Sequence, residues 1–564
     1  MLLPSLLGLS VLAATTSALP GSVSTRFASS PTVTVKNGTY IGKHNANFNQ
    51  DLFLGISYAQ QPVGNLRFAV PQSLNETWPE PRDAKEYSDI CVGYGVRPPT
   101  QSGTPKSEAC LTLNVIRDSS VDGTSSLPVG VWIHGGGFYQ GSGADQRYNM
   151  SAIVANAQRI GKPFIAVTIN YRLSTWGFLN SAEIKEAGAT NLGLRDQRLA
   201  LHWIQENIAA FGGDPRKVTI WGESAGGMSV GNHPIAYGGR DDGLFRAGIM
   251  ESGGSISASP GNTSAYQSQY DEIVSKAGCS SASATLQCLR EVPFETLNAI
   301  FNTTTGDPAY SFWPAVDGDF LREWGSVQLN KGEFPSLRGQ IPTRARRLVP
   351  RESILRSSFI TTLPVCRGAS GFRYPPAIAQ KILALYPDDP SQGIPEFLAD
   401  QRVPSKGWQW RRTSAYAGDY SMHANRRRQT EVWAQHGIPT YAYRFNMRSG
   451  NVDWIGGAEH FEEVAFVFRN FEGLGYHYGL PFDGMPETYK ELSTLMASMW
   501  ASFIVDLDPN TGVESEVYWE KYGADEPVDI VFDANVTGLG YLEDDTWRKE
   551  GIDFLNSIAR ILWR

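Results

Sequence analysis

The chain has 564 residues, of which 49 are Lys or Arg and 57 are Asp or Glu, so its net charge is −8. This balance excludes a basic nucleic-acid-binding protein. A hydrophobic content of 41% excludes a disordered acidic protein, because it is enough to build a large core. No low-complexity linker or internal repeat divides the sequence, and we expect a single domain over residues 19–564.

The first eighteen residues, MLLPSLLGLSVLAATTSA, form an apolar run that ends in small residues. This pattern is typical of a secretory signal peptide cleaved near Ala18. The alternative is a membrane anchor, but a bilayer span needs about 20 apolar residues. No later segment is long and apolar enough to span a membrane, so we expect a secreted protein without stable membrane insertion.

Five cysteines fit an oxidising compartment. Cys91 and Cys110 lie close in the sequence, as do Cys279 and Cys288, which favours two local disulfides and leaves Cys366 over. Six Asn-X-Ser/Thr triplets could carry glycans if they are exposed.

Short β-rich runs alternate with helical patterns along the chain. The runs are PVGVWIHGGGF (128–138), KPFIAVTINYRL (162–173) and KVTIWGESAGG (217–227). Between the last two, Leu194, Gln197, Leu201 and Ile204 are spaced for one helical face, and ELSTLMASMWASFI (491–504) predicts another helix. The order indicates an α/β fold with a central, mostly parallel sheet and helices on both faces. Its active site should lie at the carboxyl ends of the strands.

Gly222-Glu223-Ser224-Ala225-Gly226 follows the third β-rich run and has the pattern G-x-S-x-G. A tight turn from strand to helix needs small residues on both sides of the serine and exposes its hydroxyl as a nucleophile. The alternative is a glycine-rich turn whose serine only caps a helix. The strand before the motif and the helix after it favour the nucleophile.

The sequence His134-Gly135-Gly136-Gly137-Phe138 ends the first run, about ninety residues before the serine. Successive glycines allow backbone N–H groups to point at one oxyanion, so we assign this role to Gly136 and Gly137 together with the amide of Ala225. A phosphate loop is the alternative, but no Lys-Ser/Thr follows. We expect neither a cofactor nor a metal ion.

A general base must follow the serine in the chain. The histidines that do so are His233, His423, His436, His460 and His477. His233 is too near the serine, and His436 precedes a glycine at the end of a helical stretch, where it would cap the helix. His460 lies in the glycine-rich segment GGAEHFEEVAFVF, which favours it as the base.

These motifs resemble the type-B carboxylesterase/lipase family, the cholinesterase-like α/β-hydrolases, and especially its secreted fungal members. The resemblance covers nearly the whole chain after the leader. It rests on FLGISYAQQPVGNLRF, EACLTLNV, WIHGGGF, NYRLSTWGFL, NLGLRDQRLALHWIQENIAAFGGDP, GESAGG, AVDGDF and GAEHFEEVAFVF.

The resemblance implies a serine esterase that forms an acyl-enzyme on Ser224 with His460 as base. It also implies that Glu223 is a buried acid beside the nucleophile and that Ser252 supports the site. The cysteine pairs match the family's disulfides. The expected partner is a small ester, and the sequence leaves the natural ester and the oligomeric state open.

The loop between Cys91 and Cys110 has eighteen residues, is rich in Pro and Gly, and shows no helical apolar stripe. The family's lipases carry a long amphipathic lid there. We therefore expect a carboxylesterase that acts on soluble or small esters.

The family's third triad residue is a Glu in a motif like NTDEG, and it is absent from this sequence. Residues 335–366 instead contain six arginines, Arg338, Arg344, Arg346, Arg347, Arg351 and Arg356. Permitted codons for residues 341–349, read one base earlier, spell N-T-D-E-G-T-S-F-G. The same offset turns residues 357–365 into E-Q-F-Y-N-Y-L-A-G.

We therefore predict that residues 335–366 are a frame-shifted reading of an ordinary family segment, with the glutamate codon across Thr343 and Arg344. The alternative is a divergent, arginine-rich loop. In that case the chain is a catalytically impaired esterase or a non-catalytic interaction module.

Overall fold

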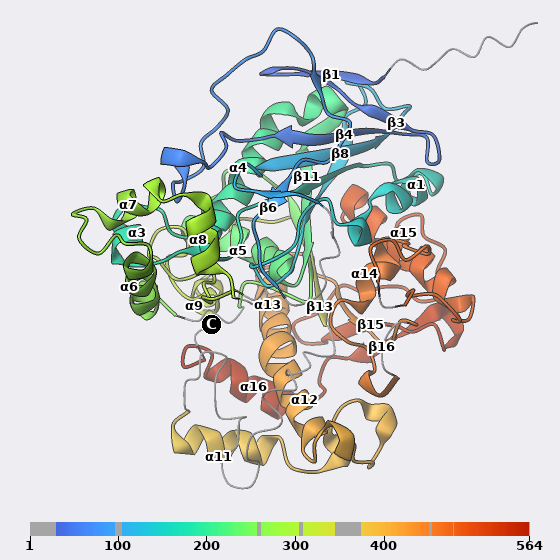
Figure 1. Cartoon of the computed structure of the whole chain (residues 1–564). Helices are drawn as coiled ribbons and strands as arrows, with labels where there is room; N and C mark the ends of the chain where they lie inside the picture. Colours follow the sequence, from blue (N-terminus) through green and yellow to red (C-terminus); the bar gives the residue numbers. More distant parts are fainter. Residues whose placement is uncertain are drawn as a thin grey trace, which may run out of the picture.

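The computed structural model describes residues 30–95, 104–256, 261–303, 308–344, 374–450, 454–477 and 479–562. Within this part of the chain, the centre of the molecule is an eleven-stranded sheet with the order β16-β15-β14-β13-β12-β11-β9-β10-β8-β4-β3 (Figure 1). Its strands are β3 (Lys43–Asn45), β4 (Gln50–Ser57), β8 (Thr112–Asp118), β9 (Leu127–Ile133), β10 (Ile165–Ile169), β11 (Gly213–Glu223), β12 (Ala247–Glu251), β13 (Gly339–Arg344), β14 (Ala442–Phe445), β15 (Val528–Phe532) and β16 (Gly540–Asp544).

The strands β15, β14, β13, β12, β11, β9 and β10 run parallel to one another, whereas β16 at one edge and β8, β4 and β3 at the other pair antiparallel with their neighbours. The predicted mostly parallel sheet of an α/β fold is confirmed. Two smaller sheets are formed by β1 (Thr32–Val35), β2 (Gly38–Ile41) and β5 (Arg82–Asp83), and by β6 (Ile90–Cys91) and β7 (Lys106–Ser107).

Helices cover both faces of the central sheet, as predicted. The described α-helices are α1 (Ser151–Arg159), α2 (Ser174–Phe178), α3 (Ala182–Glu186), α4 (Leu192–Asn207), α5 (Ala225–Gly239), α6 (Gln267–Lys276), α7 (Thr285–Glu291), α8 (Phe294–Phe301), α9 (Gly325–Asn330), α11 (Pro376–Leu385), α12 (Trp410–Gly418), α13 (Ala424–Gln435), α14 (Glu462–Val467), α15 (Thr488–Asp506) and α16 (Lys549–Ser557). Figure 1 shows α4 and α5 on one side of the strands and α1 and α15 on the other.

Successive side chains of β9 point to opposite faces of the sheet, so the strand contributes to the hydrophobic core on each face. Val129, Val131 and Ile133 belong to the core that includes α4 and α5, whereas Trp132 points to the core that includes α1 and α15. Because every one of these side chains is buried, the strand reads in the sequence as one continuous apolar run.

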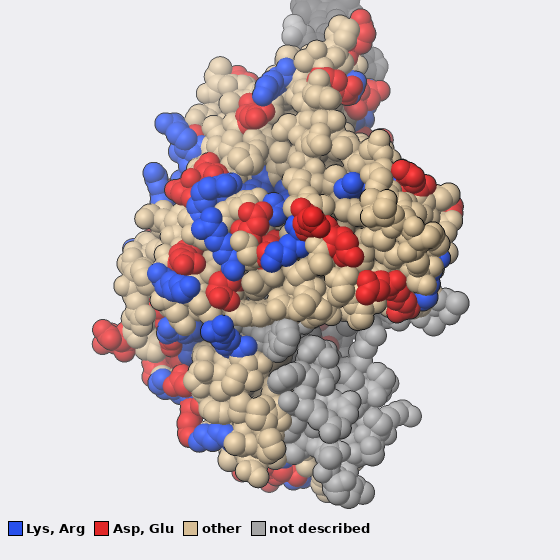
Figure 2. Space-filling view, turned by 90° about the vertical axis from the view of Figure 1, so that its left-hand side faces the viewer, with Lys and Arg blue, Asp and Glu red and all other residues tan. Residues whose placement is uncertain are grey.

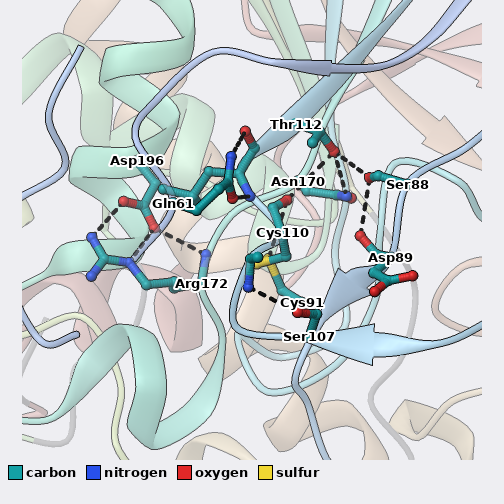
Figure 3. Close-up of a disulfide and its surroundings, with 12 residues drawn as sticks. Gln61, Ser88, Asp89, Cys91, Ser107, Cys110, Thr112, Asn170, Arg172 and Asp196 are labelled. Carbon is teal, nitrogen blue, oxygen red and sulfur yellow. Dashed lines mark hydrogen bonds and ion pairs between the residues drawn. A yellow bond between two sulfur atoms is a disulfide. The ribbon is translucent and has the colours of Figure 1, made fainter. Parts of the chain in front are cut away.

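The predicted helical face of α4 is fully buried, but so is part of its polar face. Asp196 accepts hydrogen bonds from the Arg172 side chain at 2.8 and 2.6 Å, and both residues are buried. Figure 3 shows this pair beside the Cys91–Cys110 disulfide. The second disulfide joins Cys279 to Cys288, so both cysteine pairs form the bonds expected of them.

A buried ion network joins α12, α13 and α16, which lie together at the bottom of Figure 1. Asp419 accepts from Arg548 at 2.6 Å and contacts the Nδ1 atom of His423 at 2.7 Å. Arg426 reaches Asp545 from the neighbouring helix. His423 therefore belongs to a structural ion pair, and His436 caps the end of α13 as predicted.

Three predictions fall partly or wholly on residues outside the described ranges. These are the signal peptide at 1–18, the unpaired Cys366, and residues 345–366 of the anomalous segment. Residues 339–344 of that segment are described as β13, which pairs in parallel with β12 and β14.

Charges of both signs are interspersed on the face shown in Figure 2. Among the described helices, none combines the length and the apolar composition that crossing a bilayer requires. This surface shows no single-sign patch of the kind that binds nucleic acid.

Candidate active site

Ser224 lies in a strained turn between β11 and α5. Its backbone has φ 57° and ψ −121°, a conformation that costs a non-glycine residue about 1–3 kcal/mol. A Cβ atom on Gly226 would lie 1.9 Å from the carbonyl oxygen of Ile133, and one on Gly222 would lie 2.6 Å from the same oxygen. Only glycine fits at these two positions, which explains the G-x-S-x-G pattern physically.

The glycine loop after β9 lies directly against this turn. A Cβ atom on Gly135 would stand 3.0 Å from the Cβ atom of Ser224. Gly136 and Gly137 have φ values of 99° and 65°, which side chains rarely adopt, and Ala225 is the first residue of α5. The three amides assigned to the oxyanion hole therefore belong to segments in contact with the nucleophile.

His460 reaches the nucleophile from a distant part of the chain. Its Nε2 atom lies 2.9 Å from the Oγ atom of Ser224, although 236 positions separate the two residues. The next residue, Phe461, has φ 82° and packs beneath the guanidinium of Arg147 at 4.5 Å. This contact fixes the end of the loop that carries the histidine.

Comparison with known proteins decides the family. The sequence model of the carboxylesterase family matches residues 29–344 and 378–539. The chain is 32% identical to "Lipase 5" of Diutina rugosa, over 94% of this chain and 96% of that relative. It is also 32% identical to "Secreted lipase 1" of Botryotinia fuckeliana, over 88% of each protein.

The chain belongs to the carboxylesterase family. Carboxylic ester hydrolysis is accordingly its class of reaction. A solved structure of EstA from Aspergillus niger superimposes with a TM-score of 0.78 at 25% identity, and the match covers 95% of this chain and 99% of that one. The α/β-hydrolase fold is thereby established.

Three buried carboxyl groups lie near Ser224 and His460. Glu223 places its Oε1 atom 3.2 Å from the Nε2 atom of His460. Glu463 accepts a hydrogen bond from Ser252 at 2.9 Å. Glu251 accepts from the indole N–H groups of Trp221 and Trp500, at 2.7 and 2.6 Å.

Burial raises the pKa of each of these carboxyl groups. Burial and the neighbouring Glu463 and Glu251 raise the pKa of Glu223 well above its ordinary value. Burial raises the pKa of Glu463 to about 7, against the opposing hydrogen bond from Ser252. Burial therefore favours the neutral form of the Glu223 carboxyl group at its contact with His460.

Sequence reasoning identified Glu223 and Ser252 but missed Glu251 and Glu463. Glu251 directly precedes Ser252 and pairs with Glu223 across β11 and β12, and Glu463 lies three residues after His460. The available signal for Glu251 and Glu463 was that they lie close in the sequence to Ser252 and His460. Nothing in the sequence predicts the two indole donors, which come from separate elements.

The described residues around Ser224 do not form a metal site. In that part of the chain, no three His, Cys, Asp or Glu side chains gather in the arrangement that a metal ion needs. Ser224 instead lies beside the imidazole of His460 and the glycine loop.

The position expected for the third triad residue lies at the end of β13. Met250 of β12 pairs with residue 342, and Thr343 and Arg344 pair with Tyr443 and Arg444 of β14. In this register, residues 343 and 344 lie at the same carboxyl edge of the sheet as Glu251 and Ser252. A side chain here would belong to the active-site edge.

Replacement of Glu463 by Gln should change how stability depends on pH. The carboxyl group of Glu463 has a pKa near 4.5 in the unfolded chain and about 7 in the folded protein. It therefore binds a proton only in the folded state between these values, and the wild-type free energy of unfolding should fall by ~3 kcal/mol as the pH rises from 4.5 to 7.

Glu463→Gln remains neutral and should lose less stability over this range. Urea unfolding at pH 5 and pH 8 measures the difference, and Glu472→Gln, which removes an exposed carboxylate, is the control. Equal pH dependence in Glu463→Gln and the wild type would show that Glu463 is ionised in the folded protein.

Proposed function

We propose that this chain is an exported serine esterase that acts through an acyl-enzyme on Ser224. The observation that carries the proposal is the 2.9 Å contact between the Nε2 atom of His460 and the Oγ atom of Ser224, beside the glycine loop. The apolar leader and the word "secreted" in a relative's name support export.

In the first step, the Ser224 hydroxyl attacks the carbonyl carbon of the ester while its proton passes to the Nε2 atom of His460. The N–H groups of Gly136, Gly137 and Ala225 bind the resulting oxyanion. Collapse of the tetrahedral intermediate expels the alcohol, which takes the proton from His460. Water then attacks the acyl-enzyme by the same route, releases the carboxylic acid and restores the serine.

A fluorophosphonate probe should label the protein at Ser224, because the base and the oxyanion donors are present. Replacement of Ser224 by Ala should abolish labelling, and replacement of the exposed Ser515 by Ala should leave it unchanged. Mass spectrometry of the labelled peptide measures the site. Labelling that persists in Ser224→Ala would refute the assignment.

We also propose a preference for small or soluble esters. The loop closed by Cys91 and Cys110 is held at both ends. The N–H group of Tyr94 donates to the carbonyl oxygen of Tyr139 at 2.7 Å, and Lys106 donates to the carbonyl oxygen of Gly93 at 2.8 Å. Only residues 96–103 of this loop lie outside the described ranges, so little chain remains for a lid.

This preference differs from the names of the two relatives, which are lipases, and it is open to a direct test. The rate on a short-chain ester should rise smoothly through the solubility limit of the substrate. An emulsion assay with a lid-bearing lipase as control measures this. A sharp increase when droplets form would contradict the proposal and favour a lipase.

The triad acid is missing from this sequence. This absence favours a second candidate function, that of an impaired esterase. Loss of the acid costs about 10⁴-fold in kcat when the rest of the site remains. The family match ends at residue 344 and resumes at residue 378, and the predicted frame-shifted segment spans residues 335–366. This interruption supports a changed reading frame at the place where the glutamate belongs.

Substitution Arg344→Glu should raise kcat at least tenfold, because a carboxylate at the end of β13 can orient His460 and stabilise its imidazolium form. Arg344→Gln removes the same positive charge without adding a carboxylate and should stay at the original rate. Hydrolysis of a nitrophenyl ester measures both.

Equal rates for the two variants would show that position 344 is not the acid position. Sequencing the transcript across residues 335–366 tests the frame independently. A transcript that encodes Arg344, Arg346 and Arg347 in frame would refute the frame shift.

A further inference from the structure

His134 is buried directly before the glycine loop and takes no part in the proposed proton transfer. Its side chain is shielded from solvent. The imidazole ring stacks on the ring of Tyr171, with the ring centres 4.4 Å apart. The Tyr171 hydroxyl also donates to the backbone carbonyl oxygen of His134 at 2.8 Å. One tyrosine therefore holds both the ring and the backbone of His134 in place.

A single hydrogen bond fixes the tautomer of this imidazole. Burial lowers the pKa of His134 to about 4, which favours the uncharged ring at neutral pH. The Nδ1 atom lies 2.9 Å from the carbonyl oxygen of Gly135, and a carbonyl oxygen can only accept. The buried Nε2 atom has no hydrogen-bond partner among the residues that the structure describes. The proton is therefore on Nδ1, from which it is donated to Gly135.

This hydrogen bond sets the direction of the N–H group of Gly136. The peptide bond between Gly135 and Gly136 is planar and trans, so its C=O and N–H groups point in opposite directions. Because His134 holds the carbonyl oxygen on one side, the N–H group points away from the imidazole. Within the described ranges this N–H group has no protein acceptor. It is therefore available to an oxygen of the substrate.

The next peptide of the loop is oriented by backbone groups alone. The carbonyl oxygen of Gly136 accepts from the N–H groups of Tyr139 and Gln140, at 3.2 and 3.1 Å. The N–H group of Gly137 therefore points away from this turn, and no described residue accepts from it. Of the two glycine donors, only the first depends on a side chain, which is that of His134.

Gly141 covers the hydrogen bond between His134 and Gly135. A Cβ atom on Gly141 would lie 2.5 Å from the Nδ1 atom of His134 and 2.7 Å from the carbonyl oxygen of Gly135. The φ of Gly141, 111°, is likewise one that favours glycine. The backbone at Gly141 thus packs against this hydrogen bond and excludes water from that side, which strengthens the bond.

We propose that His134 is a positioning residue for the oxyanion hole, and that it aims the N–H group of Gly136 through the carbonyl group of Gly135. The inference rests on the proposed acyl transfer at Ser224. The peptide lies next to that serine, since a Cβ atom on Gly135 would stand 3.0 Å from the Cβ atom of Ser224. Removal of one oxyanion donor costs about 10²–10³-fold in kcat. A peptide that is free to rotate should lose part of this factor.

Replacement of His134 by Phe keeps a ring on Tyr171 and removes the N–H donor. We expect kcat for a nitrophenyl ester to fall at least tenfold with KM within twofold of the wild type, because the oxyanion forms only after the ester has bound. A trifluoromethyl ketone, which forms an oxyanion when it adds to Ser224, should bind more weakly by a similar factor. His134→Asn retains a side-chain N–H group near the position of Nδ1 and should recover part of the loss.

His233→Phe is the matched control, because it also replaces a buried histidine. The Nε2 atom of His233 lies 3.0 Å from the Oε1 atom of Gln197 on α4. End-point labelling with a fluorophosphonate counts the intact sites, and kcat per labelled chain should be unchanged in His233→Phe whatever its unfolding temperature. The ratio of kcat between the wild type and His134→Phe should stay constant from pH 6 to pH 9, because the base His460 remains in place.

Equal kcat per labelled chain in the wild type and His134→Phe would overturn the inference and leave the proposed function intact. An equal loss in His233→Phe would also overturn it, because a general loss of packing would then explain the effect. The same holds if His134→Asn is no more active than His134→Phe. Wild-type protein that is not labelled at Ser224 would instead refute the proposed function, and the inference with it.

Discussion

The close approach of two backbone segments, at the ends of β9 and β11, determines the rest of the active site. The Ile133 carbonyl oxygen occupies the space that any Cβ atom on Gly222 or Gly226 would need. This contact forces the chain at Ser224 into its left-handed conformation and brings the glycine loop against it. Because both segments leave a buried sheet, the core positions Ser224 and the glycine loop, and the proposed nucleophile and oxyanion donors need little ordering when substrate binds.

Polar groups are also buried beside the turn that carries Ser224. Glu223, Glu251 and Glu463 share a region of low dielectric, where three ionised carboxylates would repel one another strongly. Burial raises the pKa of all three carboxyl groups, which disfavours their ionised forms and costs stability at higher pH.

The sheet, its covering helices and the tight turn at Ser224 could be predicted because their signals are local. Apolar runs, helical spacing and glycines around one serine each reflect constraints within a few residues. The Arg172–Asp196 pair was not predictable, because an amphipathic reading assigns charged residues of α4 to solvent. The indole donors to Glu251 were likewise not predictable, because Trp221 and Trp500 are 279 positions apart in the sequence and come together only in the folded protein. The sequence pattern did not predict the pairing of polar groups that are far apart in the chain.

The end of β13 shows why family membership and catalysis can separate. A strand is held by backbone hydrogen bonds that depend little on side-chain identity, and β13 keeps its pairing with β12 and β14 up to Arg344 although Pro342, which has no N–H group, lies within it. The triad acid, by contrast, depends on one carboxylate at one position, and a guanidinium there has the opposite charge. A change of reading frame can therefore preserve the sheet and the disulfides while it removes the group that orients His460. The chain thus keeps the fold of its family, while the proposed triad lacks a carboxylate at the carboxyl end of this single strand.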